Sequence, residues 1–254
     1  MPVKAALRIL AVALVALPLL PLQIAAVRWG WRLRARLPVL FHRIVLGIIG
    51  VKVDTRGAPE PGRPLLIVAN HVSWLDIPVI GSLMPLSFVA KSEVAGWPVI
   101  GLFARLQRSV FIERERRHKT GAATAAIGER LTAGDAMVLF GEGTTGDGVR
   151  VLPFRSALIG AAQTALRAAQ APVLVQPLAI RYARRDGLPI SRAHMPALSW
   201  IGDMDLAPHL IGVLAGGPVD VVVSWGEAVP YGETTDRKAL ARRLEGEARR
   251  MMKG

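Results

Sequence analysis

Short apolar runs alternate with helical segments through most of the chain, and this alternation limits the possible folds. From Val51 onward, the runs have the length and composition of buried strands. Segments of helical character separate them, such as the Ala-rich stretch that stops at Gly134. The predicted strands read PLLIVAN, LSFVAK, RSVFIER, AMVLFGEGT, PVLVQPLAI and PVDVVVSWG. Strands that alternate with helices predict an α/β domain over residues 51–254, with a largely parallel sheet flanked by helices.

Residues 1–50 have a different character and predict a membrane anchor. Ile9 to Val27 is a run of 19 residues without a charge, close to the roughly 20 that a helix needs to cross a bilayer. Pro18 and Pro21 lie inside this run, which predicts a kinked or re-entrant helix instead of a straight one. A second helix over residues 29–50 carries tryptophans and basic residues that suit a membrane interface.

Basic residues on the two sides of the apolar run predict its orientation. Lys4 and Arg8 precede the run, whereas Arg28, Arg32, Arg34, Arg36 and Arg43 follow it. Because the more basic flank stays in the cytoplasm, we expect the α/β domain on the cytoplasmic face of a bacterial-type inner membrane. A cleaved signal peptide is the alternative, but no small-x-small site ends the run.

The charge balance favours anionic partners. The chain has 32 Lys and Arg against 19 Asp and Glu, a net charge of +13, and no cysteine. Disulfides, thiolate metal sites and a cysteine nucleophile are therefore excluded. A membrane-tethered protein that binds lipid or nucleic acid without catalysis is one alternative class. Aromatic residues make up only 6% of the chain and lie mostly near the anchor, so we expect no nucleic acid partner.

Several apparent motifs carry no function. Gly141, Gly143 and Gly146 fit the dinucleotide-binding spacing, but Pro153 follows where a helix should begin. The chain has no Gly-x-Ser-x-Gly elbow, and its five histidines lack any zinc-ligand spacing. We therefore predict no metal site, although a metal-dependent hydrolase remains an alternative. His118 and His209 are expected at the surface or in loops, without a role.

The stretch NHVSWLD, residues 70–76, places His71 and Asp76 where the first predicted strand reaches the surface. Their spacing does not suit one helix face, but it suits a loop residue followed by the first turn of a helix. In one interpretation Asn70 and Ser73 cap that helix and Asp76 complements its dipole. In the other, His71 is a general base and Asp76 orients it. The spacing alone leaves both open.

The same stretch resembles the Asn-His-x-Ser-x-x-Asp signature of the glycerolipid acyltransferase family. VFIER, FGEGTTGDG and PVLVQPLAI resemble the family's later blocks in the same order, and the resemblance covers Pro64 to about Ile180. It implies that His71 removes the proton of an acceptor hydroxyl while Asp76 holds the other ring nitrogen. The hydroxyl then attacks an acyl thioester directly, and backbone N–H groups near Gly143 are candidates to stabilise the oxyanion.

The resemblance also implies a set of substrate-binding residues. It places Glu142, Gly143 and Thr144 on the acceptor side. The full predicted set comprises Asn70, Ser73, Arg114, Glu142, Gly143, Thr144, Asp147, Arg150 and Arg155. Asp147 is equally well explained as a turn residue, and Arg150 as solvated surface. Thr145 stands where the family has an arginine suited to a phosphate, and Arg108 stands where glycine is common.

Within the family, EGTTGDGVRVLPFRSAL and WIGDMDLAPHL resemble the members that acylate lyso-ornithine lipid. The resemblance therefore implies O-acyl transfer to a lyso-lipid hydroxyl, with lyso-ornithine lipid as acceptor. Asp147 would meet the acceptor's amine and an arginine its carboxylate. Acyl carrier protein or coenzyme A would carry the acyl group, no cofactor is implied, and the basic surface would contact an anionic membrane. The alternative is 1-acyl-glycerol-3-phosphate acyl transfer, which makes phosphatidic acid.

Overall fold

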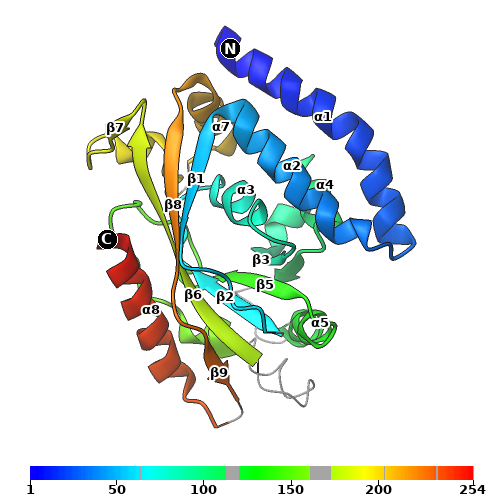
Figure 1. The fold of residues 1–254 in the computed structure, drawn as a ribbon, viewed down its shortest axis with the longest axis vertical. Coiled ribbons are helices and arrows are strands. Elements are labelled where there is room, and N and C mark those ends of the chain that lie inside the picture. The colour runs from blue at the N-terminus through cyan, green and yellow to red at the C-terminus, as the bar shows by residue number, and fades with distance from the viewer. Residues whose placement is uncertain (63, 113–119, 161–172, 203, 233, 254) are drawn as a thin grey trace.

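The computed structural model describes all residues except 63, 113–119, 161–172, 203, 233 and 254. Its centre is one twisted sheet, which has nine strands among the described residues (Figure 1). The strand order is β1-β8-β6-β2-β5-β3-β4, and β7 and β9 pair with β6. The strands are β1 (Val51–Arg56), β2 (Leu65–Ala69), β3 (Ser87–Lys91), β4 (Val110–Ile112), β5 (Ala136–Phe140), β6 (Val173–Arg185), β7 (Leu188–Pro189), β8 (Val219–Trp225) and β9 (Val229–Tyr231).

Helices cover both faces of this sheet, which confirms the predicted α/β fold. Apolar side chains of four helices pack on one face: α1 (Val3–Arg28), α2 (Leu33–Ile49), α3 (Asp76–Gly81) and α7 (Leu206–Ala215). Two others pack on the opposite face: α5 (Thr120–Thr132) and α8 (Arg237–Lys253). Three further short helices lie among the described residues: η1 (Ser92–Gly96), α4 (Ile100–Leu106) and η3 (Met195–Ala197). The core therefore has two apolar layers, one on each side of the sheet.

The sheet is largely parallel, as predicted, with an antiparallel addition. β6, β2, β5, β3 and β4 are parallel to their neighbours in this row. β8 pairs antiparallel with β6 and parallel with β1. In Figure 1, β6 is the long strand that joins both parts, because its first half pairs with β2 and its second half with β8. The site lies where these two parts meet.

β2 sets the position of the site. All five of its residues are buried, because β5 and β6 pair with its two edges and helices cover both faces. Such a strand is apolar throughout, which explains why LLIVA lacks alternation. Polar residues begin only where the strand ends, at Asn70 and His71. In open α/β sheets, ligands bind outside the carboxyl ends of the strands, and this is where His71 lies.

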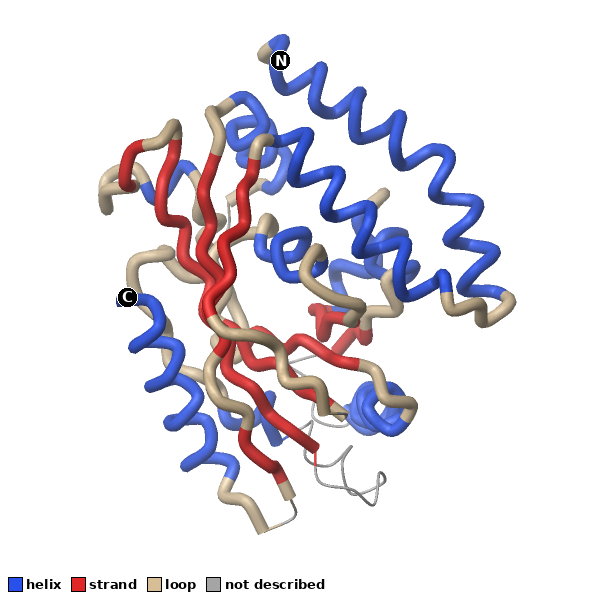
Figure 2. The backbone as a smooth tube through the Cα atoms, viewed as in Figure 1, coloured by secondary structure: helices blue, strands red, loops and turns tan. Residues whose placement is uncertain are grey.

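The predicted anchor is a single helix. α1 is unbroken from Val3 to Arg28 and includes Pro18 and Pro21, so the predicted re-entrant break is wrong. Its axis bends along its length (Figure 2), as proline inside a helix causes. Among the described residues, α1 is the one helix with the length and composition to cross a membrane. Its exposed side chains include many large apolar ones: Val3, Leu7, Leu10, Leu14, Leu17, Leu22 and Ile24.

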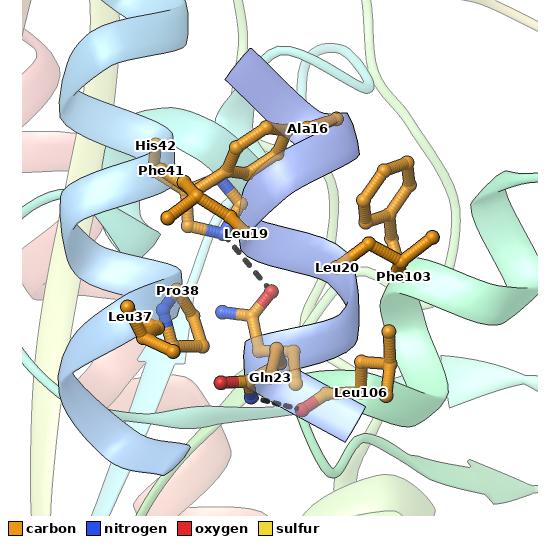
Figure 3. Close-up of a pocket in the computed structure, with 11 residues that line it drawn as sticks. Ala16, Leu19, Leu20, Gln23, Leu37, Pro38, Phe41, His42, Phe103 and Leu106 are labelled. Atoms are coloured by element: carbon orange, nitrogen blue, oxygen red, sulfur yellow. Dashed lines mark hydrogen bonds between the residues drawn. The ribbon is translucent and has the colours of Figure 1, made fainter. Parts of the chain in front are cut away.

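A hollow between α1, α2 and α4 contains a few polar groups at an otherwise apolar wall (Figure 3). Gln23 is buried there and donates from Nε2 to the carbonyl oxygens of Arg34 and Leu106, at 3.0 and 2.8 Å. His42 is also buried and contacts Gln107, and burial lowers the pKa of His42. Gln23 therefore ties α1 to both neighbouring segments by directional bonds.

Candidate active site

The loop that follows β2 wraps around the carboxylate of Asp76. One oxygen, Oδ2, accepts hydrogen bonds from His71 Nδ1 at 2.7 Å and from the backbone N–H groups of Val72 and Ser73 at 2.6 and 3.0 Å. Asp76 itself is the first residue of α3 and is fully buried. The structure therefore brings the histidine and the aspartate together, although they cannot share a helix face. The interpretation of Asn70 and Ser73 as caps is wrong, because α3 has no side-chain cap.

The second oxygen of Asp76 accepts a hydrogen bond from the hydroxyl of Tyr182 at 2.6 Å. Tyr182 lies on β6 and is buried, and burial together with the charge of Asp76 raises its pKa well above the ordinary range. Our sequence analysis missed this residue. A tyrosine just beyond the predicted strand PVLVQPLAI was visible, but only the pairing of β6 with its neighbours shows which side chains reach Asp76.

The hydrogen bonds fix the chemistry of the histidine. An ionised carboxylate only accepts hydrogen bonds, so His71 carries its proton on Nδ1 and leaves Nε2 as the basic nitrogen. The imidazole stacks on Phe140, the last residue of β5, with ring centroids 3.8 Å apart and an interplanar angle of 13°. The His71 side chain is 17% exposed, whereas that of Asp76 is not exposed. This arrangement can take a proton from a bound hydroxyl group.

Glu142 supports the loop from the other side. Its two oxygens accept the backbone N–H groups of His71 and Leu152, each at 2.7 Å, and the residue is 2% exposed. Burial raises the pKa of Glu142 to about 7, against the lowering effect of these two hydrogen bonds. Both carboxylate oxygens bind the protein backbone, so Glu142 supports the loop. Its contact with the acceptor stays a prediction.

Asn70, Ser73 and Gly143 also differ from their predicted substrate contacts. Asn70 is buried and forms two hydrogen bonds with the backbone of Ile180, at 2.8 and 3.1 Å, which fasten the loop to β6. Ser73 is fully buried. Gly143 has a φ of +71°, and its N–H donates to the carbonyl oxygen of Phe140 within a turn. That N–H is therefore committed to the turn and does not fit the predicted oxyanion role.

The remaining predicted residues lie in or near the glycine-containing loop that follows β5 (residues 141–150). Asp147 is partly exposed and accepts the N–H groups of Val149 and Arg150 at 2.9 and 2.8 Å, so the turn interpretation is confirmed. The side chain of Arg150 is 84% exposed and lies 3.8 Å from Asp147. Thr144 and Arg155 are exposed. Arg114 and His118 lie outside the described residues.

The segment WIGDMDLAPHL reaches the same loop. The Trp200 N–H donates to the carbonyl oxygen of Val72 at 2.9 Å. The indole N–H of Trp74 donates to Nδ1 of His209 at 3.1 Å. His209 is 7% exposed and lies on α7, so the expectation of a surface or loop histidine is wrong. A polar residue on an otherwise apolar helix face was the signal that sequence reasoning passed over.

The arrangement of the potential metal ligands was compared with what a metal site requires. Among the described residues, no three His, Asp or Glu side chains gather closely enough to hold a metal ion. His71 is bonded to Asp76, and both oxygens of Asp76 accept hydrogen bonds from the protein. The loop is therefore arranged to orient an imidazole.

Several known proteins are similar in sequence to this chain over most of its length. Lyso-ornithine lipid O-acyltransferase of Brucella abortus is 53% identical over 88% of this chain and 83% of the relative. The enzyme of the same name from Rhizobium meliloti is 44% identical over 98% and 86%. The 1-acyl-sn-glycerol-3-phosphate acyltransferase of Neisseria gonorrhoeae is 33% identical over 78% and 72%.

A comparison of folds finds a structure of the same kind of enzyme. The crystal structure of the 1-acyl-sn-glycerophosphate acyltransferase PlsC from Thermotoga maritima superposes with a TM-score of 0.61, at 22% identity, over 86% of this chain and 78% of that one. The model of the family described as Acyltransferase matches residues 50–181, which include β2, the loop that follows it (residues 70–75) and most of β6. This chain therefore belongs to the acyltransferase family and is an acyltransferase enzyme.

Proposed function

We propose that this enzyme transfers a fatty acyl group from an acyl thioester to the hydroxyl of lyso-ornithine lipid, with His71 as general base and Asp76 as its orienting acid. The observation that carries the proposal is the 2.7 Å contact between His71 Nδ1 and a carboxylate that accepts three further hydrogen bonds. The relatives from Brucella abortus and Rhizobium meliloti, named for this reaction, support the acceptor.

The reaction needs two proton transfers, one from the acceptor hydroxyl to His71 and one from His71 to the leaving thiolate. His71 Nε2 takes the proton of the acceptor hydroxyl as its oxygen attacks the thioester carbonyl carbon. The bond from carbon to sulfur then breaks, and the thiolate leaves with the proton that the imidazolium returns. Asp76 stabilises the imidazolium between these steps, and Tyr182 holds Asp76 in place. No acyl-enzyme is needed, which agrees with a chain without cysteine.

The acceptor headgroup meets the rim of the site in this proposal. Asp147 is 38% exposed and Arg150 84% exposed at their side chains, so both remain accessible to solvent beside the glycine loop. A carboxylate and a guanidinium side by side suit the amine and the carboxylate of an ornithine headgroup. Thr145 stands in the same loop without the planar cation that would favour a phosphate.

The membrane and the donor complete the proposal. In this proposal the enzyme lies at the inner membrane, which the exposed apolar face of α1 supports. The α/β domain lies on the cytoplasmic face, which the basic flank after the apolar run supports. Acyl carrier protein or coenzyme A supplies the acyl group. Both donors are acidic, and exposed arginines on α8 offer them an attractive surface: Arg242, Arg243, Arg249 and Arg250.

The test is acyl transfer from labelled acyl carrier protein and labelled acyl coenzyme A to a panel of lyso-lipids, with His71→Ala beside the wild type. We expect transfer to lyso-ornithine lipid that disappears in the variant. Transfer only to 1-acyl-glycerol-3-phosphate would overturn the acceptor assignment in favour of the alternative. Full activity of His71→Ala would overturn the mechanism, whatever the acceptor.

A further inference from the structure

Three arginines gather at the edge of the sheet opposite the catalytic loop. A hollow opens at the amino ends of β3 and β5, between the first turns of α2 and the segment after α4. Arg34 and Arg108 line it together with Asp135, and Arg130, which lines an adjoining hollow, lies 3.8 Å from Asp135. We call this the arginine hollow. Because His71 follows the carboxyl end of β2, which is parallel to β5, the hollow is separate from the active site.

Arg108 occupies a backbone position that glycine normally fills. α4 ends in a Schellman turn, in which the Ser109 N–H donates to Ala104 O and the Arg108 N–H to Arg105 O. Arg108 is the left-handed residue of this turn, with a φ of +64°. A side chain other than glycine is strained there. The arginine that bears this strain extends its guanidinium to Asp135, with an N–O distance of 2.8 Å. Strain of this kind is concentrated at functional sites.

Positive charge exceeds negative charge in the hollow. Asp135 is the one carboxylate among the described lining residues, and it contacts Arg108 at 2.8 Å and Arg130 at 3.8 Å. Glu129 lines an adjoining hollow and is exposed. Burial lowers the pKa of Arg130 and the charges of Arg108 and Arg34 lower it further, whereas the charges of Asp135 and Glu129 raise it. Like charges that repel one another in a partly buried site are relieved by a bound anion.

The position of the hollow favours a lipid anion over a soluble one. Arg34 lies shortly after the turn that joins α1 and α2, where Trp29 and Trp31 stack with centroids 5.3 Å apart. These tryptophans are 63% and 44% exposed. Exposed tryptophans beside an apolar helix mark the depth of the lipid headgroups. The carbonyl oxygen of Arg34 is bonded to Gln23 of α1, which fixes the hollow next to that helix.

We propose that the arginine hollow binds the phosphodiester of an acidic phospholipid headgroup. The guanidinium groups of Arg34, on α2, and Arg108, in the turn after α4, would contact its oxygens in competition with Asp135. This site serves neither the acyl donor nor the acceptor. It fixes how the α/β domain sits on the membrane, and it stands independently of the acceptor proposed above.

The experiment uses the full chain in a non-ionic detergent and measures binding of short-chain phosphatidylglycerol by the shift in melting temperature. Phosphatidylcholine of the same chain length and inorganic phosphate are the comparison ligands. Arg108→Gly should weaken phosphatidylglycerol binding by about tenfold or more, the effect of one lost charge-assisted hydrogen bond. The matched control, Arg192→Ala, removes one exposed arginine between β7 and η3 and should bind as the wild type does.

Arg108→Gly also relieves the strained turn, so the variant should melt no lower than the wild type. Asp135→Asn should act in the opposite direction and tighten binding, because it removes the carboxylate that competes with the phosphate. If Asp135→Asn fails to fold, Arg34→Gln replaces it and should weaken binding. Unchanged binding in Arg108→Gly, or equal binding of phosphatidylcholine, would overturn the site. Competition by inorganic phosphate at the concentration of the lipid would overturn the lipid as its ligand.

Discussion

The loop after β2 (residues 70–75) and helix α1 are held in place by different kinds of contact. The loop after β2 is short and polar, and hydrogen bonds to the buried Asp76, Glu142 and Asn70 fix its backbone. α1 is long and apolar, and most of its large side chains are exposed. Few polar contacts hold α1, among them those of Gln23 and the bonds from Arg8 to the carbonyl oxygens of Leu214 and Gly216.

This difference teaches where mutations should act. The residues that hold the loop serve both the fold and the chemistry, because they also shape the surroundings of His71. The outer face of α1 serves neither the core nor the reaction, since its apolar side chains are exposed. Substitutions of the residues that hold the loop should change rate and stability together. Substitutions on the outer face of α1 should change only the attachment to a membrane.

The largest effect is expected for His71→Ala. Removal of a general base should lower kcat by about a hundredfold or more. The loop should keep its backbone, because the contacts of Asp76 with Val72, Ser73 and Tyr182 remain. Turnover in detergent and a thermal melt measure the two properties. A variant within a few-fold of the wild type would show that another group takes the proton.

Tyr182→Phe tests whether the hydrogen bond from Tyr182 to Asp76 affects the reaction rate. The loss of one hydrogen bond to a buried carboxylate should cost about 1.5–3 kcal/mol of stability and lower kcat by roughly tenfold, with KM unchanged. Tyr231→Phe is the matched control. Tyr231 is also fully buried, but its hydroxyl donates to Ile159 O at 3.3 Å, away from the site. Equal rates for the two variants would reduce Tyr182 to a structural residue.

Glu142 gives the loop a pH dependence. Burial raises its pKa from 4.5 to about 7, so the folded protein keeps a proton that the unfolded chain loses between these values. The stability that this group contributes is therefore complete below pH 4.5 and is lost as the pH rises to about 7. Glu142→Gln should remove this slope. Denaturant melts of both proteins across this range measure it, and parallel curves would contradict the shifted pKa.

The smallest effects are expected in α1, where two substitutions should differ. Gln23→Leu leaves the carbonyl oxygens of Arg34 and Leu106 without their donor and should cost about 1–3 kcal/mol. Leu14→Ser changes an exposed side chain and should alter stability in detergent by less than about 0.5 kcal/mol. It should instead weaken retention by lipid vesicles. A destabilised Leu14→Ser would mean that this face packs against protein.

Much of the fold followed from the sequence, because strand and helix patterns are local. The alternation of apolar runs predicted the α/β sheet, and Gly134 ends α5 in a left-handed conformation as expected. The uncharged run and its two prolines predicted a kinked or re-entrant helix, and α1 is one unbroken helix whose axis bends. Both prolines are on the exposed face, where a missing N–H and a bend interfere with no packed neighbour.

The sequence by itself determined the α/β fold, the apolar helix, and the residue types that the chemistry uses, His71 and Asp76. Only the tertiary structure decided which polar groups serve the active site from a distance. Asn70 and Glu142 turned inward to bind backbone, and Tyr182 arrived from β6 through a strand pairing that spans more than a hundred residues. Local patterns encode periodicity and turn chemistry, whereas hydrogen bonds between distant segments depend on sheet register, which no local pattern contains.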